Sequence, residues 1–254
     1  MEKGMILETK GLTKNFGGIA AVNNLNLKVT KDEIRGLIGP NGSGKTTFIN
    51  TVTGVLACTS GEIKFKGHSI HGLKPHSIAS LGVSRTFQQV LLFNELTVLE
   101  NVILGRHYRT YAGIWDALFR TPRSRREEEA AKEHALGCLA LVGLEDKASE
   151  LAKNLPEGQR RLVEVARALA TEPKLFFLDE PTGGMTEQEV SGFLKLIKEI
   201  HARSITIFLI EHNMRVVMEV AEFITVINYG MKIAEGPPEE IQRDKEVIDA
   251  YLGK

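Results

Sequence analysis

The hydrophobic residues of this chain fall into patterns that predict different elements. Three short runs are almost wholly apolar, over residues 34–38, 175–178 and 205–210. Strands buried on both faces of a parallel sheet have this composition, so we expect the runs to form strands of one sheet. The second and third runs end in polar residues, which should therefore lie at the carboxyl edge of that sheet.

The other segments show alternation or helical spacing, and the whole pattern predicts an α/β fold. Up to about Phe65, short alternating segments predict an antiparallel β lobe packed on the core. From about Val90 to Asn154 the apolar residues recur near helical spacing, which predicts a helical lobe. The segments after Lys174 return to the core, and residues 223–234 are expected to form another small sheet segment. We expect one domain over 1–254, with core and antiparallel lobe at 1–89 and 156–254 and the helical lobe at 90–155.

A glycine-rich loop follows the first apolar run and leads into an apolar helical pattern. Its glycines let the backbone N–H groups point inward, where they and the helix N-terminus can hold a polyphosphate. Lys45 would reach the β- and γ-phosphates, and Thr46 would ligate Mg²⁺. The loop predicts that nucleotide is bound by Gly39, Pro40, Asn41, Gly42, Ser43, Gly44, Lys45, Thr46 and Thr47.

Two carboxylates, Asp179 and Glu180, end the second apolar run. In a nucleotide site, Asp179 would hold Mg²⁺ directly or through water, and Glu180 would polarise the water that attacks the γ-phosphate. The alternative is a solvated turn at the end of a strand, marked by Pro181. The phosphate loop upstream favours the first interpretation.

A histidine follows the third apolar run, in the sequence Glu-His-Asn over residues 211–213. A single histidine is more often a surface or core residue than a catalytic one, and this chain has seven. Only His212 stands where a strand of the predicted sheet would bring it to the nucleotide. His212 is therefore a candidate site residue.

These motifs, in this order, resemble those of the nucleotide-binding subunit of an ABC transporter, and the resemblance covers nearly the whole chain. It implies a P-loop NTPase core of the RecA type, with an antiparallel β lobe and an inserted helical lobe in an L-shaped ATPase. It also implies that Phe16 stacks on adenine, for which a core phenylalanine is the alternative. Gln88 would sense Mg²⁺ and couple to a membrane subunit.

The resemblance also assigns roles to the remaining candidates. The catalytic residues would be Lys45, Gln88, Glu180 and His212, and the metal residues Thr46, Gln88 and Asp179. The signature motif, which contacts the ATP of a partner chain, corresponds to Leu155, Pro156, Glu157, Gly158 and Gln159.

The mechanism implied by the family is a head-to-tail dimer. Each ATP, with Mg²⁺, would lie between the phosphate loop of one chain and the signature motif of a second ATPase subunit, identical or different. Binding would close the pair and hydrolysis would open it, because only the closed state makes both sets of phosphate contacts. Two membrane-spanning permease subunits would convert closure into alternating access, with an extracytoplasmic amino-acid-binding protein acting indirectly.

Within that family, residues 85–102 and 249–254 are similar to the ATPase of LIV-type importers, which take up branched-chain amino acids. An insertion from about Arg106 to Glu133 agrees with this, and its apolar stripe at residues 114–119 either packs on its own lobe or contacts a partner. Urea, other amino acids or lipopolysaccharide export are alternative cargoes. A soluble DNA-repair ATPase shares the motif order, but such proteins usually insert long coiled coils, and this chain lacks sustained heptads.

Composition agrees with a cytoplasmic enzyme. The chain has 32 basic and 32 acidic residues, so no basic excess points to nucleic acid as a partner. Cys58 and Cys138 are isolated thiols without metal spacing, which suits a reducing compartment. No apolar run approaches the roughly twenty residues that cross a bilayer, and we recognise no signal peptide. We expect a peripheral protein on the cytoplasmic face of the plasma membrane.

The signature motif departs from the family pattern of Leu-Ser-Gly-Gly-Gln. Pro156 supplies neither a serine hydroxyl nor an N–H, and the Glu157 carboxylate would face the γ-phosphate, so both should weaken closure on ATP. Residues 184–187 also replace the usual sequence of the D-loop. Since the phosphate loop and carboxylates are intact, we expect the effect to fall on the partner's ATP. The alternative is that Gly158, Gln159 and the helix N-terminus suffice.

Overall fold

The structure is a computed structural model that describes residues 4–106 and 122–252. It divides into two compact units, which we describe separately. The first unit is made of Met1–Arg85 and Lys174–Lys254, and the second unit is Thr86–Pro173. The apolar stripe of the expected insertion lies outside the described residues.

The first unit is built around a six-stranded sheet in the order β10-β9-β3-β8-β7-β6. Its strands are β3 (Ile34–Ile38), β6 (Val83–Arg85), β7 (Leu175–Asp179), β8 (Thr206–Ile210), β9 (Phe223–Asn228) and β10 (Met231–Gly236). All neighbours pair in parallel except β9 and β10. Every residue of β3, β7 and β8 is buried, as a strand covered on both faces requires. The predicted parallel sheet is confirmed.

The last two strands form the sheet segment expected over residues 223–234, and they join the six-stranded sheet through β9. Gly36 of β3 lies opposite Ile224 of β9, and Ile38 lies opposite Val226. The four middle residues of β9 are buried, so this strand is covered on both faces as an interior strand is. The sequence did not indicate that β9 pairs with β3, because a short apolar run does not reveal which strand it pairs with.

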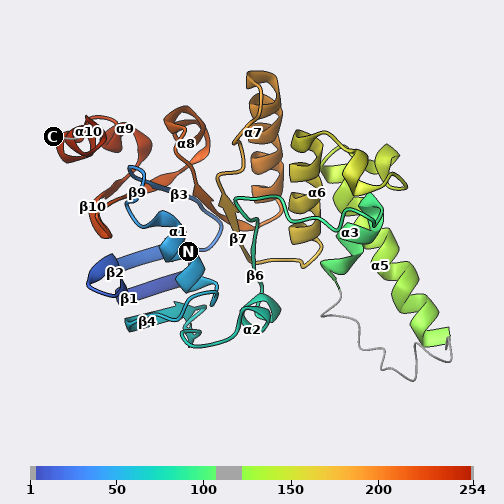
Figure 1. Cartoon of the computed structure of the whole chain (residues 1–254), viewed down its shortest axis with the longest axis horizontal. Helices are drawn as coiled ribbons and strands as arrows, with labels where there is room; N and C mark the ends of the chain where they lie inside the picture. The colour runs from blue at the N-terminus through green and yellow to red at the C-terminus, as the bar shows by residue number, and fades with distance from the viewer. Residues whose placement is uncertain (1–3, 107–121, 253–254) are drawn as a thin grey trace. The chain divides into compact units, whose positions relative to one another are not determined.

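A second, four-stranded antiparallel sheet has the order β2-β1-β4-β5. Its strands are β1 (Met5–Phe16), β2 (Ile19–Thr30), β4 (Ser60–Phe65) and β5 (His68–Ser69). Figure 1 shows β1 and β2 beside the helix α1 (Lys45–Val52). One apolar cluster joins both sheets and α1, and the Phe208 ring lies 5.7 Å from that of Phe48 and 5.0 Å from that of Phe177. This is the expected antiparallel lobe on the core.

Five further helices lie in the described part of the first unit. They are α2 (Pro75–Ser80), α7 (Glu187–His201), α8 (Met214–Val220), α9 (Pro238–Ile241) and α10 (Lys245–Leu252). The residues that replace the usual D-loop lead directly into α7, whose N-cap is Thr186 in a capping box with Glu189. The local sequence therefore fixes where this helix begins.

The second unit is helical. It contains α3 (Val98–Leu104), α5 (Pro122–Leu141), α6 (Glu157–Leu169) and short 3-10 helices at Glu145–Lys147 and Ala152–Asn154. The helices α3, α5 and α6 pack against one another. The expected helical lobe ended at residue 155, whereas the compact unit continues to Pro173, because α6 belongs to this helical cluster.

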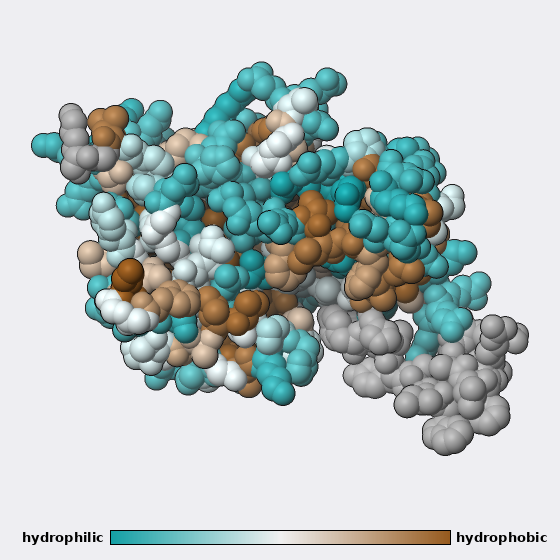
Figure 2. Space-filling model, in the orientation of Figure 1, coloured by the Kyte–Doolittle hydropathy of each residue, from teal (hydrophilic) through white to brown (hydrophobic). Residues whose placement is uncertain are grey.

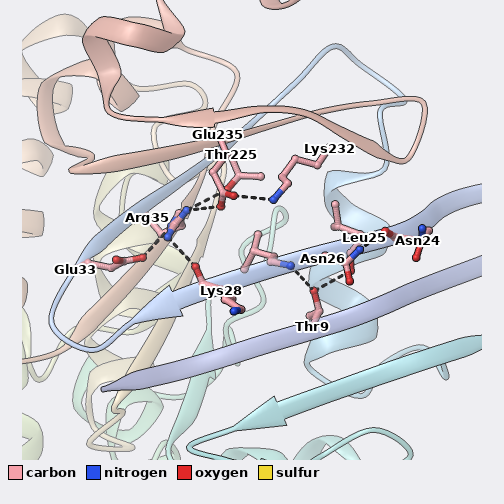
Figure 3. A network of polar contacts seen from close by, with 11 residues as sticks. Thr9, Asn24, Leu25, Asn26, Lys28, Glu33, Arg35, Thr225, Lys232 and Glu235 are labelled. Carbon is pink, nitrogen blue, oxygen red and sulfur yellow. Dashed lines mark hydrogen bonds and ion pairs between the residues drawn. The ribbon is translucent and has the colours of Figure 1, made fainter. Parts of the chain in front are cut away.

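A buried arginine links three strands of the first unit. Arg35 on β3 donates to Glu33 at 2.8 Å, to Glu235 on β10 at 2.7 Å and to the carbonyl of Lys28 on β2 at 2.7 Å (Figure 3). Its guanidinium also lies 4.3 Å from the ring centroid of Phe223. The Arg35 side chain is 5% exposed, so these contacts replace water around its charge.

Candidate functional site

The glycine-rich loop connects β3 to α1, as predicted. Gly44 is the N-cap of α1 with a φ of 106°, a left-handed conformation that favours glycine. A Cβ on Gly44 would lie 2.2 Å from the Ala21 carbonyl oxygen, and one on Gly39 would lie 2.0 Å from the Ile227 carbonyl oxygen. The neighbouring backbone thus approaches the loop so closely that only glycine fits at these two positions.

Polar groups in the loop are available to an anion. The Lys45 ammonium is buried and donates to the carbonyls of Gly39 at 2.7 Å and Pro40 at 3.0 Å. Burial lowers the pKa of Lys45, and the charges of Glu180 and Asp179 raise it. The Ser43 hydroxyl oxygen is buried without a hydrogen-bond partner among the described residues. Thr46 is exposed and Thr47 is half-buried on the first turn of α1.

Asp179 is the last residue of β7 and is 1% exposed. Burial raises the pKa of its carboxyl, while the Arg85 cation lowers that pKa. The guanidinium of Arg85, at the end of β6, lies 3.1 Å from Asp179 and donates to Asn50 of α1 at 2.7 Å. Arg85 therefore connects this carboxylate to the helix that follows the glycine-rich loop.

Glu180 and His212 follow neighbouring strands and approach each other. Glu180 has a φ of 47°, an uncommon left-handed conformation for a residue with a side chain, and its N–H donates to the Ile210 carbonyl at 2.8 Å. The His212 ring nitrogen Nδ1 lies 3.7 Å from the Glu180 carboxylate. Because β3, β8 and β7 are adjacent and parallel, their carboxyl ends bring the loop, His212 and the two carboxylates to one edge of the sheet.

Phe16 ends β1 and is 49% exposed. The ammonium of Lys14 lies 5.1 Å from the centroid of its ring. The alternative of a core phenylalanine is wrong, because half of this side chain faces solvent. The ring is available for stacking.

Gln88 and the signature residues belong to the second unit. Gln88 is exposed in the segment between β6 and α3. Leu155 is buried, Pro156 is the N-cap of α6, and Glu157 lies in the first turn, where its carboxylate is 3.8 Å from Arg161. Gly158 and Gln159 continue this turn, and both are half-buried. These residues do not belong to the unit that carries the glycine-rich loop.

Sequence reasoning missed several residues that support the site. The sequence motifs assign no role to Arg85 or Glu211, although a charge at the end of an apolar strand is a signal for one. A third is Tyr251 on α10, whose hydroxyl pKa is raised by burial and lowered by the backbone of Gly39. No sequence spacing signals this contact, because it joins the end of α10 to the end of β3.

Comparisons with known families agree with this geometry. Residues 22–183 match the family described as "ABC transporter". Residues 231–254 match the family described as "Branched-chain amino acid ATP-binding cassette transporter". The first match contains the glycine-rich loop, Asp179 and Glu180, and the second contains β10, α9 and α10.

The chain is also similar to curated proteins over nearly its whole length. It is 43% identical over 98% of both chains to the high-affinity branched-chain amino acid transport ATP-binding protein BraF of Pseudomonas aeruginosa. It is 42% identical over 98% of both chains to the protein LivG of Escherichia coli K12, which has the same description. A probable branched-chain amino acid transport ATP-binding protein LivG of Archaeoglobus fulgidus is 37% identical, over 98% of this chain and 95% of that protein.

Solved structures of ABC transporter cassettes are similar to this chain as well. An ATP-binding cassette of an ABC transporter in its ADP conformation matches with a TM-score of 0.85 and 32% identity, over 98% of this chain and 99% of that one. A dimeric bacterial ABC transporter cassette matches with a TM-score of 0.79 and 26% identity, over 92% and 99% of the two chains. The chain therefore belongs to the ABC transporter family, as an ATP-binding cassette ATPase.

Proposed function

We propose that this chain hydrolyses ATP to drive the import of branched-chain amino acids through partner membrane subunits. The observation that carries the proposal is the meeting of the glycine-rich loop, Asp179, Glu180 and His212 at one edge of the sheet. The cargo rests on the relatives, which are 42–43% identical over 98% of this chain and are named for branched-chain amino acid transport.

The triphosphate of ATP fits the loop between β3 and α1. Its backbone N–H groups and the N-terminus of α1 supply donors. The buried Ser43 hydroxyl has no hydrogen-bond partner among the described residues and can donate to the anion. Lys45 holds its ammonium against two loop carbonyls, from which it can turn to the β- and γ-phosphates. Phe16 stacks on the adenine.

The residues present also fit Mg²⁺. Asp179 supplies a carboxylate oxygen and Thr46 a hydroxyl, which are the hard ligands that Mg²⁺ takes beside the phosphates of a nucleotide. We assign Gln88 as the third protein residue, in accord with its place in the family motif. When bound, Mg²⁺ neutralises charge on the phosphates. Arg85 orients Asp179 from the side of β6.

Glu180 and His212 carry the chemistry of hydrolysis in this proposal. The Glu180 carboxylate accepts a hydrogen bond from the attacking water. This contact polarises the water and orients the water oxygen towards the γ-phosphate. His212, 3.7 Å from that carboxylate, is positioned to contact the γ-phosphate as it becomes free phosphate. Lys45 remains on the β- and γ-phosphates and stabilises the charge on them.

The active form is a dimer, in which the signature residues of one chain cover the ATP of the other. Glu157 lies in the first turn of α6, where the helix N-terminus would otherwise attract phosphate, and it places a negative charge there. Pro156, as the N-cap, has no N–H or hydroxyl to donate. We therefore propose that this chain works best with a second ATPase whose signature motif is of the usual kind.

The membrane partners are two permease subunits, and the chain lies on the cytoplasmic face of the membrane. Among residues 4–106 and 122–252, no helix is long and apolar enough to cross a bilayer. Figure 2 shows hydrophobic side chains gathered over α3 and the segment before it. Exposed Leu91 and Phe93 lie in this segment, whose backbone is held by Arg167 and Asn101 at 2.6–3.0 Å. This ordered apolar surface suits a permease.

The first test is steady-state ATPase activity with Mg²⁺ of the wild-type chain and of the Glu180→Gln variant. We expect turnover in the wild type and its loss in the variant, with binding of a fluorescent ATP analogue retained. Glu199→Gln is the matched control, because this side chain is exposed near the end of α7 and lies outside every motif. Turnover by Glu180→Gln at the wild-type rate would contradict the role of Glu180.

The cargo is tested separately in proteoliposomes that contain the chain with its permease subunits, partner ATPase and binding protein. ATP-dependent uptake of labelled leucine, absent with Glu180→Gln, is the expected result. Uptake of urea but not of leucine would contradict the cargo assignment and leave the ATPase assignment intact. Equal turnover by the chain alone and by its mixture with the partner ATPase would contradict the proposed effect of Pro156 and Glu157.

A further inference from the structure

A buried carboxylate beside the site has no role in the mechanism above. Glu211 follows β8 directly and is 0% exposed. One of its oxygens, Oε1, accepts from the Thr182 N–H at 3.0 Å and from the Thr182 hydroxyl at 2.5 Å. The other, Oε2, accepts from the N–H groups of His212 at 3.1 Å and Asn213 at 3.3 Å. Each oxygen thus serves a different loop.

The two loops are those that carry the proposed chemistry. Thr182 stands two residues after Glu180, in the turn that follows β7, and His212 begins the turn that follows β8. The His212 Nδ1 atom lies 3.7 Å from the Glu180 carboxylate and 3.8 Å from Glu211 Oε2. One side chain between the two loops therefore sets how Glu180 and His212 face each other.

The chemistry of this position calls for a carboxylate. Glu211 is the acceptor in all four of these hydrogen bonds, and a carboxylate has two oxygens that only accept. Glutamine has the same shape, but its amide has one accepting oxygen and one donating nitrogen. Whichever way that amide turns, its NH₂ group meets the donors of one loop. Burying a carboxylate is unfavourable without hydrogen bonds, and these four donors offset that cost.

We propose that Glu211 is a positioning residue for ATP hydrolysis, which fixes the Glu180 loop with one oxygen and the His212 loop with the other. The proposal rests on the proposed roles of Glu180 and His212. Glu211 does not reach the reacting atoms itself. Its effect is on the rate of the chemical step, because the binding of ATP depends on the loop between β3 and α1.

The test compares Glu211→Gln with wild type in ATP turnover and in binding of a fluorescent ATP analogue. Since a displacement of about 1 Å at a catalytic group can lower the rate about 100-fold, we expect kcat to fall about 10- to 100-fold while the affinity for the analogue is unchanged. Thr182→Val removes one donor and should lower kcat less, and Thr182→Ser, which keeps the hydroxyl, should restore it. In the Glu211→Gln background, Thr182→Val should slow turnover by a smaller factor than it does in the wild type, because both residues belong to one network.

A second measurement does not depend on turnover. In nucleotide-free protein, Glu211→Gln should speed amide hydrogen exchange in peptides covering 180–184 or 211–214, with exchange in α1 unchanged. Wild-type kcat in both Glu211→Gln and Thr182→Val would overturn the proposal, as would a loss of ATP affinity equal to the loss of kcat. If Glu180→Gln retains full turnover, the proposed role of Glu180 fails, whereas the exchange result still reports whether Glu211 holds the two loops.

Discussion

Replacing Arg35 by methionine tests whether the buried network of Figure 3 holds the first unit together. Methionine has a similar length and no charge, so the packing against Phe223 is largely kept while every hydrogen bond of the guanidinium is removed. The change leaves Glu33 with a side chain that is 9% exposed and with Thr30 as its remaining donor. Glu235 keeps its contacts with Lys232 and Thr225.

The expected loss of stability follows from the burial of the ion pair between Arg35 and Glu33. Removing one partner of a buried ion pair usually lowers the free energy of unfolding by about 3–5 kcal/mol, because the other charge is left buried alone. Because the Thr30 hydroxyl still donates to Glu33, we expect a loss of unfolding free energy near the lower end of this range. At about 2–4 °C per kcal/mol for a chain of this size, a loss of about 3 kcal/mol should lower the melting temperature by about 6–12 °C.

The assay is thermal unfolding of the nucleotide-free chain, followed by circular dichroism for wild type and variants in one buffer. Lys232→Met is the control, because its contact with Glu235 lies at the edge of the network, where ion pairs contribute about 0–1 kcal/mol. Adding Glu33→Gln to Arg35→Met should recover part of the loss by removing the isolated charge. A melting temperature for Arg35→Met within about 2 °C of wild type would refute the reasoning.

Three other predictions follow from single contacts. Gly44→Ala should abolish binding of a fluorescent ATP analogue, because its Cβ would lie 2.2 Å from the Ala21 carbonyl oxygen. The control Gly192→Ala, in α7, meets nothing within 4 Å and should bind. Burial raises the pKa of Asp179, so Mg²⁺ affinity, titrated in the presence of ATP, should fall on acidification at a higher pH than for an ordinary aspartate. The same shift favours folding below the ordinary aspartate pKa, and that contribution is lost as the pH rises through the raised value. Thr186→Ala removes a capping box and should lower the free energy of unfolding, measured in urea, by about 1 kcal/mol.

Much of the first unit could be predicted because its signals are local. Continuous apolar runs identified β3, β7 and β8, and the spacing of glycines, Lys45 and Thr46 identified the loop between β3 and α1. Parallel strands then bring their carboxyl ends together, so the meeting of Asp179, Glu180 and His212 at one edge was expected.

The remaining features depend on strand order, which no local pattern encodes. Arg35 and Glu235 are 200 residues apart in sequence, and their contact exists because β9 places β10 near β3. Glu211 meets Thr182 because β8 lies beside β7. The boundary at Pro173 likewise depends on the packing of α6, whose apolar spacing alone does not reveal its partners.

The strand order of the six-stranded sheet also has a consequence for how the protein is made. The strand β3, which leads into the ATP-binding loop, lies between β8 and β9, and both are translated long after it. Asn228 follows Ile38 by about 190 residues, so at about 5–20 residues per second a ribosome needs roughly 10–40 s to supply both neighbours. The hairpin of β1 and β2 can form early, because its strands are adjacent in the chain. The apolar β3 must therefore stay unpaired on the nascent chain during this time. An exposed apolar strand is prone to aggregate, so this is the segment that chaperones need to cover most.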